Sequence, residues 1–111
     1  GRLVARAKSL ARREVETRYR EGFMAALETI ATPKRHANVL QHMAGYFKTL
    51  LDQPSRAELQ DTIKDYHQGL VPLIVPITLI RHHVRQHSVA YLAGQIYLDP
   101  HPKELMLRNH V

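Results

Sequence analysis

The sequence predicts an all-α fold, a compact bundle of four to five short helices, and three observations favour it. Apolar residues recur at steps of three and four along most of the 111 residues, which is the spacing of one helix face. No segment alternates apolar and polar residues as a half-buried strand does. Prolines and glycines interrupt the apolar stripes at intervals that suit short helices. The length predicts one domain over residues 1–111, and the helix-like start at Gly1 indicates a piece of a longer protein.

The first predicted helix ends before Thr32-Pro33. Its apolar stripe consists of Val15, Tyr19, Phe23, Leu27 and Ile30. Upstream, Leu3, Val4 and Leu10 indicate either a short separate helix or a continuation of the first one toward the N-terminus. Thr32 suits the N-cap of the next helix, because its hydroxyl can accept a bond from a free backbone N–H, and Pro33 suits the first turn.

A second helix is predicted over residues 33–51, with one buried stripe along it. That stripe consists of Val39, Leu40, Met43, Phe47 and Leu50. Gly45 lies inside this helix, where a glycine costs roughly 1 kcal/mol relative to alanine. The cost predicts that another backbone segment, or a ligand, lies close to Gly45.

A third helix is predicted after Asp52-Gln53-Pro54. Ser55 and Glu58 have the spacing of a capping box, in which each side chain bonds the other's free backbone N–H. Gly69 is expected to end the helix in the left-handed conformation. The apolar positions of this helix are Leu59, Ile63 and Tyr66, and its acids are Glu58, Asp61 and Asp65.

Pro72 is expected to open a fourth helix, which carries a cluster of cations over residues 81–87. Ser88 is then expected to cap a short separate segment over residues 89–92. The stretch Asp99-Pro100-His101-Pro102 predicts a rigid turn before a short tail. The apolar stripe of the fourth helix consists of Leu73, Ile77, Ile80 and Val84.

The chain has 16 Lys and Arg against 10 Asp and Glu, a formal net charge of +6, and eight His in addition. Such a chain favours polyanionic partners, of which nucleic acid comes first and an anionic membrane second. Between residues 52 and 70, four acids stand against two bases, which indicates an acidic face there. The first, second and fourth helices are therefore expected to form a basic face. The alternative is a solvated charged surface that only keeps the domain in solution.

The absence of cysteine excludes disulfides, zinc–thiolate sites, cysteine nucleophiles and cysteine-ligated iron–sulfur clusters in this chain acting alone. It also fits a cytoplasmic location. The longest apolar stretch, residues 70–80, contains two prolines and is too short to cross a bilayer. We therefore expect no membrane partner and no cofactor.

Three side chains one helical turn apart are the candidates for contact with an RNA base: Asn38, His42 and Tyr46. An amide, an imidazole and a phenol ring along one line suit hydrogen bonding to, and stacking on, an unpaired base. Alternatively, Asn38 and His42 bond a neighbouring helix end while Tyr46 packs at the rim. The candidates for contact with phosphate are Arg12, Arg13, Arg35, Arg81 and Arg85, together with His82.

No catalytic motif is present: the sequence has no glycine-rich phosphate loop, no Gly-x-Ser-x-Gly elbow and no His-Glu-x-x-His. We therefore predict no catalytic residue and no metal ligand. A weaker alternative is a metal-dependent enzyme that uses His36, His42 and His83. Its weakness is that zinc normally takes three or four protein ligands, and these histidines share no helix face.

Three motifs follow one another along nearly the whole chain. They are His36-x-Asn38-Val39-Leu40-x-His42-x-x-Gly45-Tyr46-Phe47, Tyr66-x-x-Gly69-x-x-Pro72-Leu73-x-x-Pro76 and Tyr91-Leu92-x-x-Gln95-x-Tyr97-Leu98-x-Pro100-x-Pro102. In these motifs, and in the closing Leu107-Arg108-Asn109, the sequence resembles the YbgA-like bacterial family, also called domain of unknown function 1722. Members of that family commonly follow a cysteine-containing desulfidase domain that uses an iron–sulfur cluster.

The resemblance implies a division of labour, because such fusions remove sulfur from 4-thiouridine in tRNA. This chain would then be a non-catalytic, tRNA-binding accessory domain that assists a fused or separate desulfidase. The alternative is an interaction or scaffold domain without specific RNA binding. In that case the acidic third helix, or the turn at residues 100–102, would contact the catalytic partner.

Overall fold

The computed structural model describes residues 2–29 and 32–98, with side chains as far as Ser88, and every regular element in these ranges is helical. The prediction of a small all-α bundle is therefore confirmed. Ile30, the last position of the first predicted stripe, and the turn at residues 99–102 lie outside the described residues. The elements are α1 (Arg2–Arg18), the π-helical turn η1 (Tyr19–Phe23), α2 (Met24–Thr29), α3 (Pro33–Tyr46), α4 (Gln53–His67) and α5 (Ile74–Leu98).

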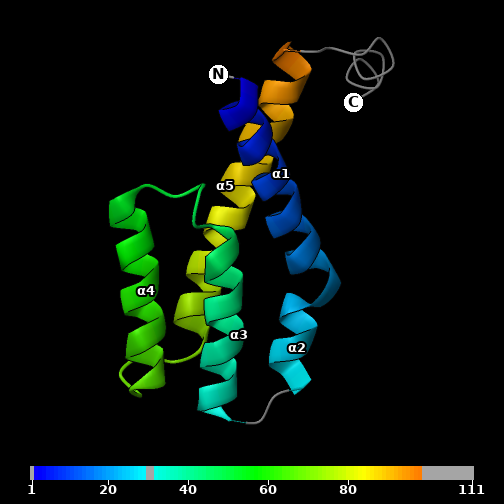
Figure 1. Cartoon of the computed structure of the whole chain (residues 1–111). Coiled ribbons are helices and arrows are strands. Elements are labelled where there is room, and N and C mark those ends of the chain that lie inside the picture. Colours follow the sequence, from blue (N-terminus) through cyan, green and yellow to red (C-terminus); the bar gives the residue numbers. More distant parts are fainter. Residues whose placement is uncertain (1, 30–31, 99–111) are drawn as a thin grey trace.

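The helix α3 lies at the centre of the bundle, with α4 on one side and α2 on the other, while α5 passes behind them (Figure 1). Contacts join α5 to α1, α3 and α4. The first half of α1 and the second half of α5 lie side by side and project beyond the other helices (Figure 1). The molecule is consequently elongated, with extents of 50 × 32 × 17 Å.

The core is aliphatic with two phenylalanines, and the four predicted stripes supply most of it. Leu40 on α3, Phe47 directly after α3 and Ile80 on α5 are completely buried. Burial of a Leu, Ile or Phe side chain contributes about 1.5–3 kcal/mol, so these contacts dominate the stability of the bundle. The other buried members of the stripes are Val15, Phe23, Leu27, Met43, Leu59, Ile63, Ile77 and Val84. Five further members are only partly buried: Tyr19, Val39, Leu50, Tyr66 and Leu73.

The segment that begins with Leu3 continues into the first helix, so one of the two predicted alternatives is confirmed: α1 is unbroken from Arg2. A π-helical turn then interrupts the α-helical repeat at residues 19–23. Its cause is visible in the stripe, where Val15, Tyr19, Phe23 and Leu27 follow one another at steps of four. An α-helix advances about 40° beyond a full turn at each such step. The wider turn absorbs this drift and keeps all four side chains on the core side.

The start of α4 corrects the predicted capping box. Asp52 is the N-cap, and its Oδ1 accepts the backbone N–H of Ser55 at 2.8 Å. That bond occupies the N–H which would otherwise be free in the first turn, so Ser55 and Glu58 have no capping role. Gly69 ends the segment at φ = 78°, as predicted, because glycine adopts a positive φ without steric cost.

The helix α3 ends at Tyr46, earlier than the predicted residue 51, and residues 47–50 form a turn. Backbone bonds from Phe47 to Ala44 and from Leu50 to Phe47 tighten this end. No heavy atom other than the helix's own backbone lies within 4 Å of the place where a Cβ on Gly45 would stand. The predicted close approach of a backbone to Gly45 is therefore wrong.

The fourth predicted helix begins at Ile74, two residues after Pro72, and it does not end at residue 87. The predicted cap at Ser88 is wrong, because α5 continues through it to Leu98. No proline lies between Pro76 and Pro100 to stop the helix, and contact with α1 supports its length. Serine is a weak break when packing favours the helix.

Candidate nucleic-acid interface

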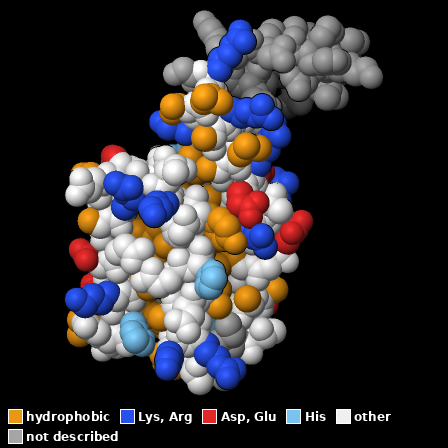
Figure 2. Space-filling model, viewed as in Figure 1, with side chains coloured by type: hydrophobic (Ala, Val, Ile, Leu, Met, Phe, Trp, Pro, Cys, Tyr) orange, Lys and Arg blue, Asp and Glu red, His pale blue; other side chains and the backbone are white. Residues whose placement is uncertain are grey.

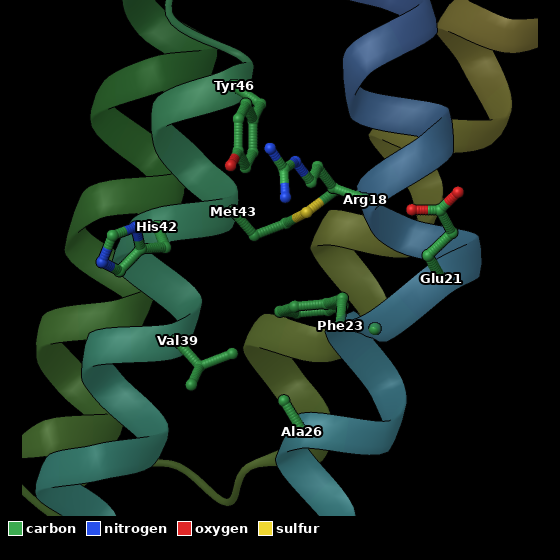
Figure 3. Close-up of a pocket in the computed structure, with 9 residues that line it drawn as sticks. Arg18, Glu21, Phe23, Ala26, Val39, His42, Met43 and Tyr46 are labelled. Carbon is green, nitrogen blue, oxygen red and sulfur yellow. The ribbon is translucent and has the colours of Figure 1, made fainter.

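A hollow of about 420 Å³ lies between η1 and α2 on one side and α3 on the other (Figure 3). Phe23 and Met43 point toward each other across the gap and form its floor with Val39 and Ala26 (Figure 3). The floor is therefore apolar, and polar groups stand around it. The complete lining is Arg18, Glu21, Gly22, Phe23, Ala26, Val39, His42, Met43 and Tyr46.

Arg18 and Tyr46 form one end of this hollow. The guanidinium carbon of Arg18 lies 5.5 Å from the centre of the Tyr46 ring, a cation–π distance. The Nε of Arg18 also donates a hydrogen bond of 2.8 Å to Oε1 of Glu14, one turn earlier on α1. This hydrogen bond, followed by the charge interactions with Tyr46 and Glu14, raises the pKa of Arg18. The side chain is thus held charged and oriented although it is exposed.

The structure brings together two of the three predicted base-contacting residues. Tyr46 and His42 line the same hollow, whereas Asn38 is exposed one turn before His42 on α3 and does not line the hollow. His42 lies on the outer side of α3, with its ring turned away from Phe23 (Figure 3). Neither Asn38 nor His42 bonds a neighbouring helix end, within the residues that the structure describes.

A different histidine bonds a helix end. Nε2 of His36 lies 3.0 Å from the carbonyl oxygen of Leu27 in α2, and Nδ1 lies 3.0 Å from the Tyr66 hydroxyl in α4. Because a carbonyl oxygen only accepts, Nε2 carries a proton and donates it, and in the neutral ring the hydroxyl donates to Nδ1. His36 therefore ties three helices together and has no free ring nitrogen.

The three histidines of the metal-dependent alternative do not form a common site in the structure. His36 is engaged at both nitrogens, His42 is exposed at the hollow, and His83 is buried against Phe47, with the two ring centres 5.9 Å apart. Over residues 2–29 and 32–98, no three His, Asp or Glu side chains form a group that could hold a metal ion.

Of the arginines predicted to meet phosphate, Arg35 and Arg85 are exposed, on the first turn of α3 and on α5. Arg81 is half-buried instead, and its Nε donates a hydrogen bond of 3.3 Å to the hydroxyl of Tyr19. Arg81 thus joins α5 to η1. Arg13 is exposed on α1.

Arg12 of α1 and two histidines of α5, His83 and His87, occupy the seam between α1, α3 and α5, where both histidine rings lie against Phe47. His83 is 7% exposed, and its Nε2 has no hydrogen-bond partner in the described part of the chain; the same is true of Nε of Arg12. Burial lowers the pKa of His83, and the neighbouring His82 lowers it further, against the opposing effect of Glu58 and Asp52. Burial, Arg12 and His83 lower the pKa of His87. His82 is exposed and packs edge-on against His83 at 5.4 Å.

Sequence reasoning missed Arg18, Glu21 and Gly22, which the π-helical turn and its flank bring to the hollow. The signal was present, since a strict four-residue apolar repeat predicts a turn wider than an α-helix. Apart from its two neighbours and the backbone of its own helical segment, no heavy atom of the described residues lies within 4 Å of a Cβ placed on Gly22. The space beside this residue is therefore open.

Comparison with known proteins gives the family of the chain. The model of a family described as "Protein of unknown function (DUF1722)" matches residues 1–102. The chain belongs to this family. A DUF1722 relative, "Uncharacterized protein YbgA" of Escherichia coli (strain K12), is 35% identical over 91 residues. These residues are 82% of this chain and 54% of the relative, so the chain spans about half the relative's length. No solved structure matches.

The DUF1722 match covers every helix described above, including the hollow and the seam. Among the described helices, none is long and apolar enough to cross a membrane. On the face shown in Figure 2, Lys and Arg side chains lie at the lower end, on the left edge and at the projecting end. Acidic side chains gather on this face where α1 passes (Figure 2).

Proposed function

We propose that this domain binds structured RNA, tRNA in the first instance, and assists a desulfidase without performing chemistry itself. One observation carries the proposal: α3 and α5, the two helices at the centre of the bundle, contain no Asp or Glu at all. Between them they carry four Lys or Arg residues, and most of the histidines: Lys34, Arg35, Arg81, Arg85, His36, His42, His82, His83 and His87.

The exposure of these cations supports contact with phosphate. Lys34, Arg35 and Arg85 are exposed and have no carboxylate partner in the described part of the chain. On α1, no acid precedes Glu14, so every charged residue at the projecting end of that helix is basic. Uncompensated cations release counterions from nucleic acid when they bind, which makes the affinity strongly dependent on salt.

The resemblance to the family is the reason for proposing a desulfidase as the partner of this domain. In the fusions, the chemistry on thiolated uridine belongs to the cysteine-containing domain, and this chain has no cysteine. An accessory domain that holds the tRNA needs only charge and a surface for unpaired bases. Both requirements match the composition of this chain.

The test is the binding of tRNA at several salt concentrations, measured by fluorescence anisotropy. The double variant Arg35→Gln and Arg85→Gln should weaken binding to every RNA and reduce the slope of log K against log[salt] by roughly 1 for each lost phosphate contact. Lys64→Gln is the matched control, because Lys64 is exposed on the acidic helix α4. No detectable tRNA binding by the intact domain at low salt would overturn the proposal.

A second candidate function, docking of a catalytic partner, is favoured by a surface on the other side of the bundle. There, α4 and α5 enclose an apolar hollow of about 630 Å³, and Ile74 and Leu70 stay 57% and 69% exposed. Its wall on α4 includes Glu58, which belongs to the acidic element predicted as a contact surface.

Titration calorimetry with a desulfidase domain distinguishes this candidate. Val75→Asp, in the apolar wall, should abolish complex formation, whereas Gln41→Asp, an exposed change on α3, should not. Equal affinity in both variants would exclude the α4–α5 hollow as the docking surface.

A further inference from the structure

We infer that the hollow between η1 and α3 is a site for a single unpaired nucleobase. The inference rests on the proposed function and adds to it the chemical class of the group that is recognised. Charge on α3 and α5 explains attraction to any polyanion, but it does not explain an apolar floor surrounded by polar groups. A nucleobase combines two apolar faces with a polar edge.

The floor of the hollow suits a flat ring. Phe23 is 5% exposed and Met43 is 2% exposed, so their inner surfaces are fixed by the core, while Val39 is only partly buried and faces the gap. The volume of about 420 Å³ lies within the range of small-molecule sites. A thioether and an aromatic ring also pack favourably against a π-system.

The upper end of the hollow is a prepared stacking surface. Arg18 lies over Tyr46 at 5.5 Å and is oriented by its bond to Glu14. A guanidinium plane stacks on bases as well as on aromatic rings, and base–aromatic stacking tolerates any base. A base that enters the hollow therefore meets a planar group whose orientation is already set before RNA binds.

The π-helical turn provides the entrance. Gly22 lines the hollow and has nothing within 4 Å of the position of a Cβ. A Cβ at this position would meet no other part of the described chain, so close packing of a neighbouring segment is not the reason for the glycine. We attribute it to the space that a ligand needs. Glu21 and His42 also line the hollow, but their side chains turn outward from its two opposite walls (Figure 3), so recognition of the base rests on the apolar floor and on Arg18.

The experiment compares two RNA hairpins with the same stem. One is fully paired, and the other carries a single bulged 2-aminopurine, whose fluorescence reports stacking. The wild-type domain should bind the bulged hairpin about fivefold or more tightly, which corresponds to the lower end of base-stacking energies, and should quench its fluorescence. Gly22→Leu should remove both the preference and the quenching, while the affinity for the paired hairpin stays unchanged.

Gly45→Leu is the matched control, since Gly45 also has open space around its Cβ position but lies outside the lining of this hollow. It should retain the preference and the quenching. Circular dichroism verifies that both variants fold. If Gly22→Leu does not fold, Arg18→Gln replaces it, because this exposed change removes the stacking plane over Tyr46. Should the wild-type domain bind both hairpins equally, without quenching, the base site is refuted and RNA binding stands. If neither hairpin binds, the proposed function itself fails.

Discussion

Two arginine–tyrosine contacts in this molecule join the same kinds of residue and have opposite consequences. Arg81 of α5 donates a hydrogen bond to the hydroxyl of Tyr19, half-buried between two helices. Arg18 of α1 lies over the face of Tyr46 at the edge of an open hollow. The first contact uses the donor of the guanidinium to hold helices together. The second leaves a planar, charged surface beside solvent, so it is the one that can serve a ligand.

The comparison teaches why composition alone misassigns arginines. Arg81 was predicted to meet phosphate because it lies in a cationic helix without acids, yet one of its donors belongs to the fold. Arg18 lies between two nearby acids, Glu14 on α1 and Glu21 on η1, and was not among the predicted phosphate contacts. Whether an arginine can contact a ligand depends on which residues surround its side chain. The packing of the helices decides these neighbours, and the local sequence does not.

The largest expected difference between the two contacts concerns their tyrosines. Tyr46→Ala should reduce affinity for RNA with unpaired bases by roughly 5- to 150-fold, since stacking contributes about 1–3 kcal/mol per base. Tyr46→Phe should keep most of that affinity, because it retains the ring. Tyr19→Phe should leave RNA affinity unchanged. Anisotropy titrations measure all three, and an equal loss in Tyr46→Ala and Tyr19→Phe would contradict the distinction.

The fold was predictable from sequence wherever a feature depends on local pattern. Stripes at steps of three and four placed Leu40, Phe47 and Ile80 in the core, and Gly69 and Thr32 acted as caps. The failures share one cause, which is that packing outweighs weak local signals. A serine at position 88 did not end α5, because α1 packs beside the second half of that helix.

The candidate site was predictable only along a single helix. His42 and Tyr46 were found because they lie on one face of α3. The opposite wall was not found, because it comes from a segment about 20 residues away in sequence and from a turn that departs from the α-helical repeat. Only the packing of the bundle brings η1 opposite α3, and the periodicity of a single sequence does not show which helices lie opposite each other.

The second prediction tests whether the Arg81 contact is structural. Tyr19→Phe removes a half-buried hydrogen bond and should lower the free energy of unfolding by about 1 kcal/mol. For a domain of this size, that loss corresponds to a decrease in melting temperature of about 4–8 °C. Arg18→Gln should change the melting temperature less, because the Arg18–Glu14 pair is exposed. Thermal unfolding followed by circular dichroism decides it, and a larger decrease for Arg18→Gln would reverse the assignment.

The third prediction concerns the pH dependence of folding, which the two histidines of the seam should influence. The pKa values of His83 and His87 lie below the ordinary value of about 6.5, because burial disfavours their charged forms. The unfolded chain therefore binds protons more readily than the folded one. The stability that they contribute is complete above pH 6.5 and is lost as the pH falls through their lowered pKa values.

The groups that face these two histidines set the size of the effect. Arg12 on α1 and His82 on α5 oppose protonation, whereas Glu58 on α4 and Asp52 at its cap favour protonation of His83. Urea unfolding between pH 7.5 and 5 should show a fall in stability, and His83→Leu should flatten it. A profile for His83→Leu that coincides with the wild-type profile would mean that His83 does not titrate differently on folding.

The smallest expected effect is that of Gly45→Ala. This substitution changes the turn of α3 that carries Tyr46 and leaves the residues that line the hollow unchanged. Gly45→Ala should raise the free energy of unfolding by about 0.5–1 kcal/mol, since alanine favours the helix and no heavy atom obstructs its Cβ. The affinity for RNA should be unchanged or slightly higher, because a stiffer turn holds Tyr46 under Arg18. Thermal unfolding and anisotropy measure the two quantities on one sample. If stability rises while RNA affinity falls, the RNA backbone lies against Gly45, and the contact surface extends from the hollow across the end of α3.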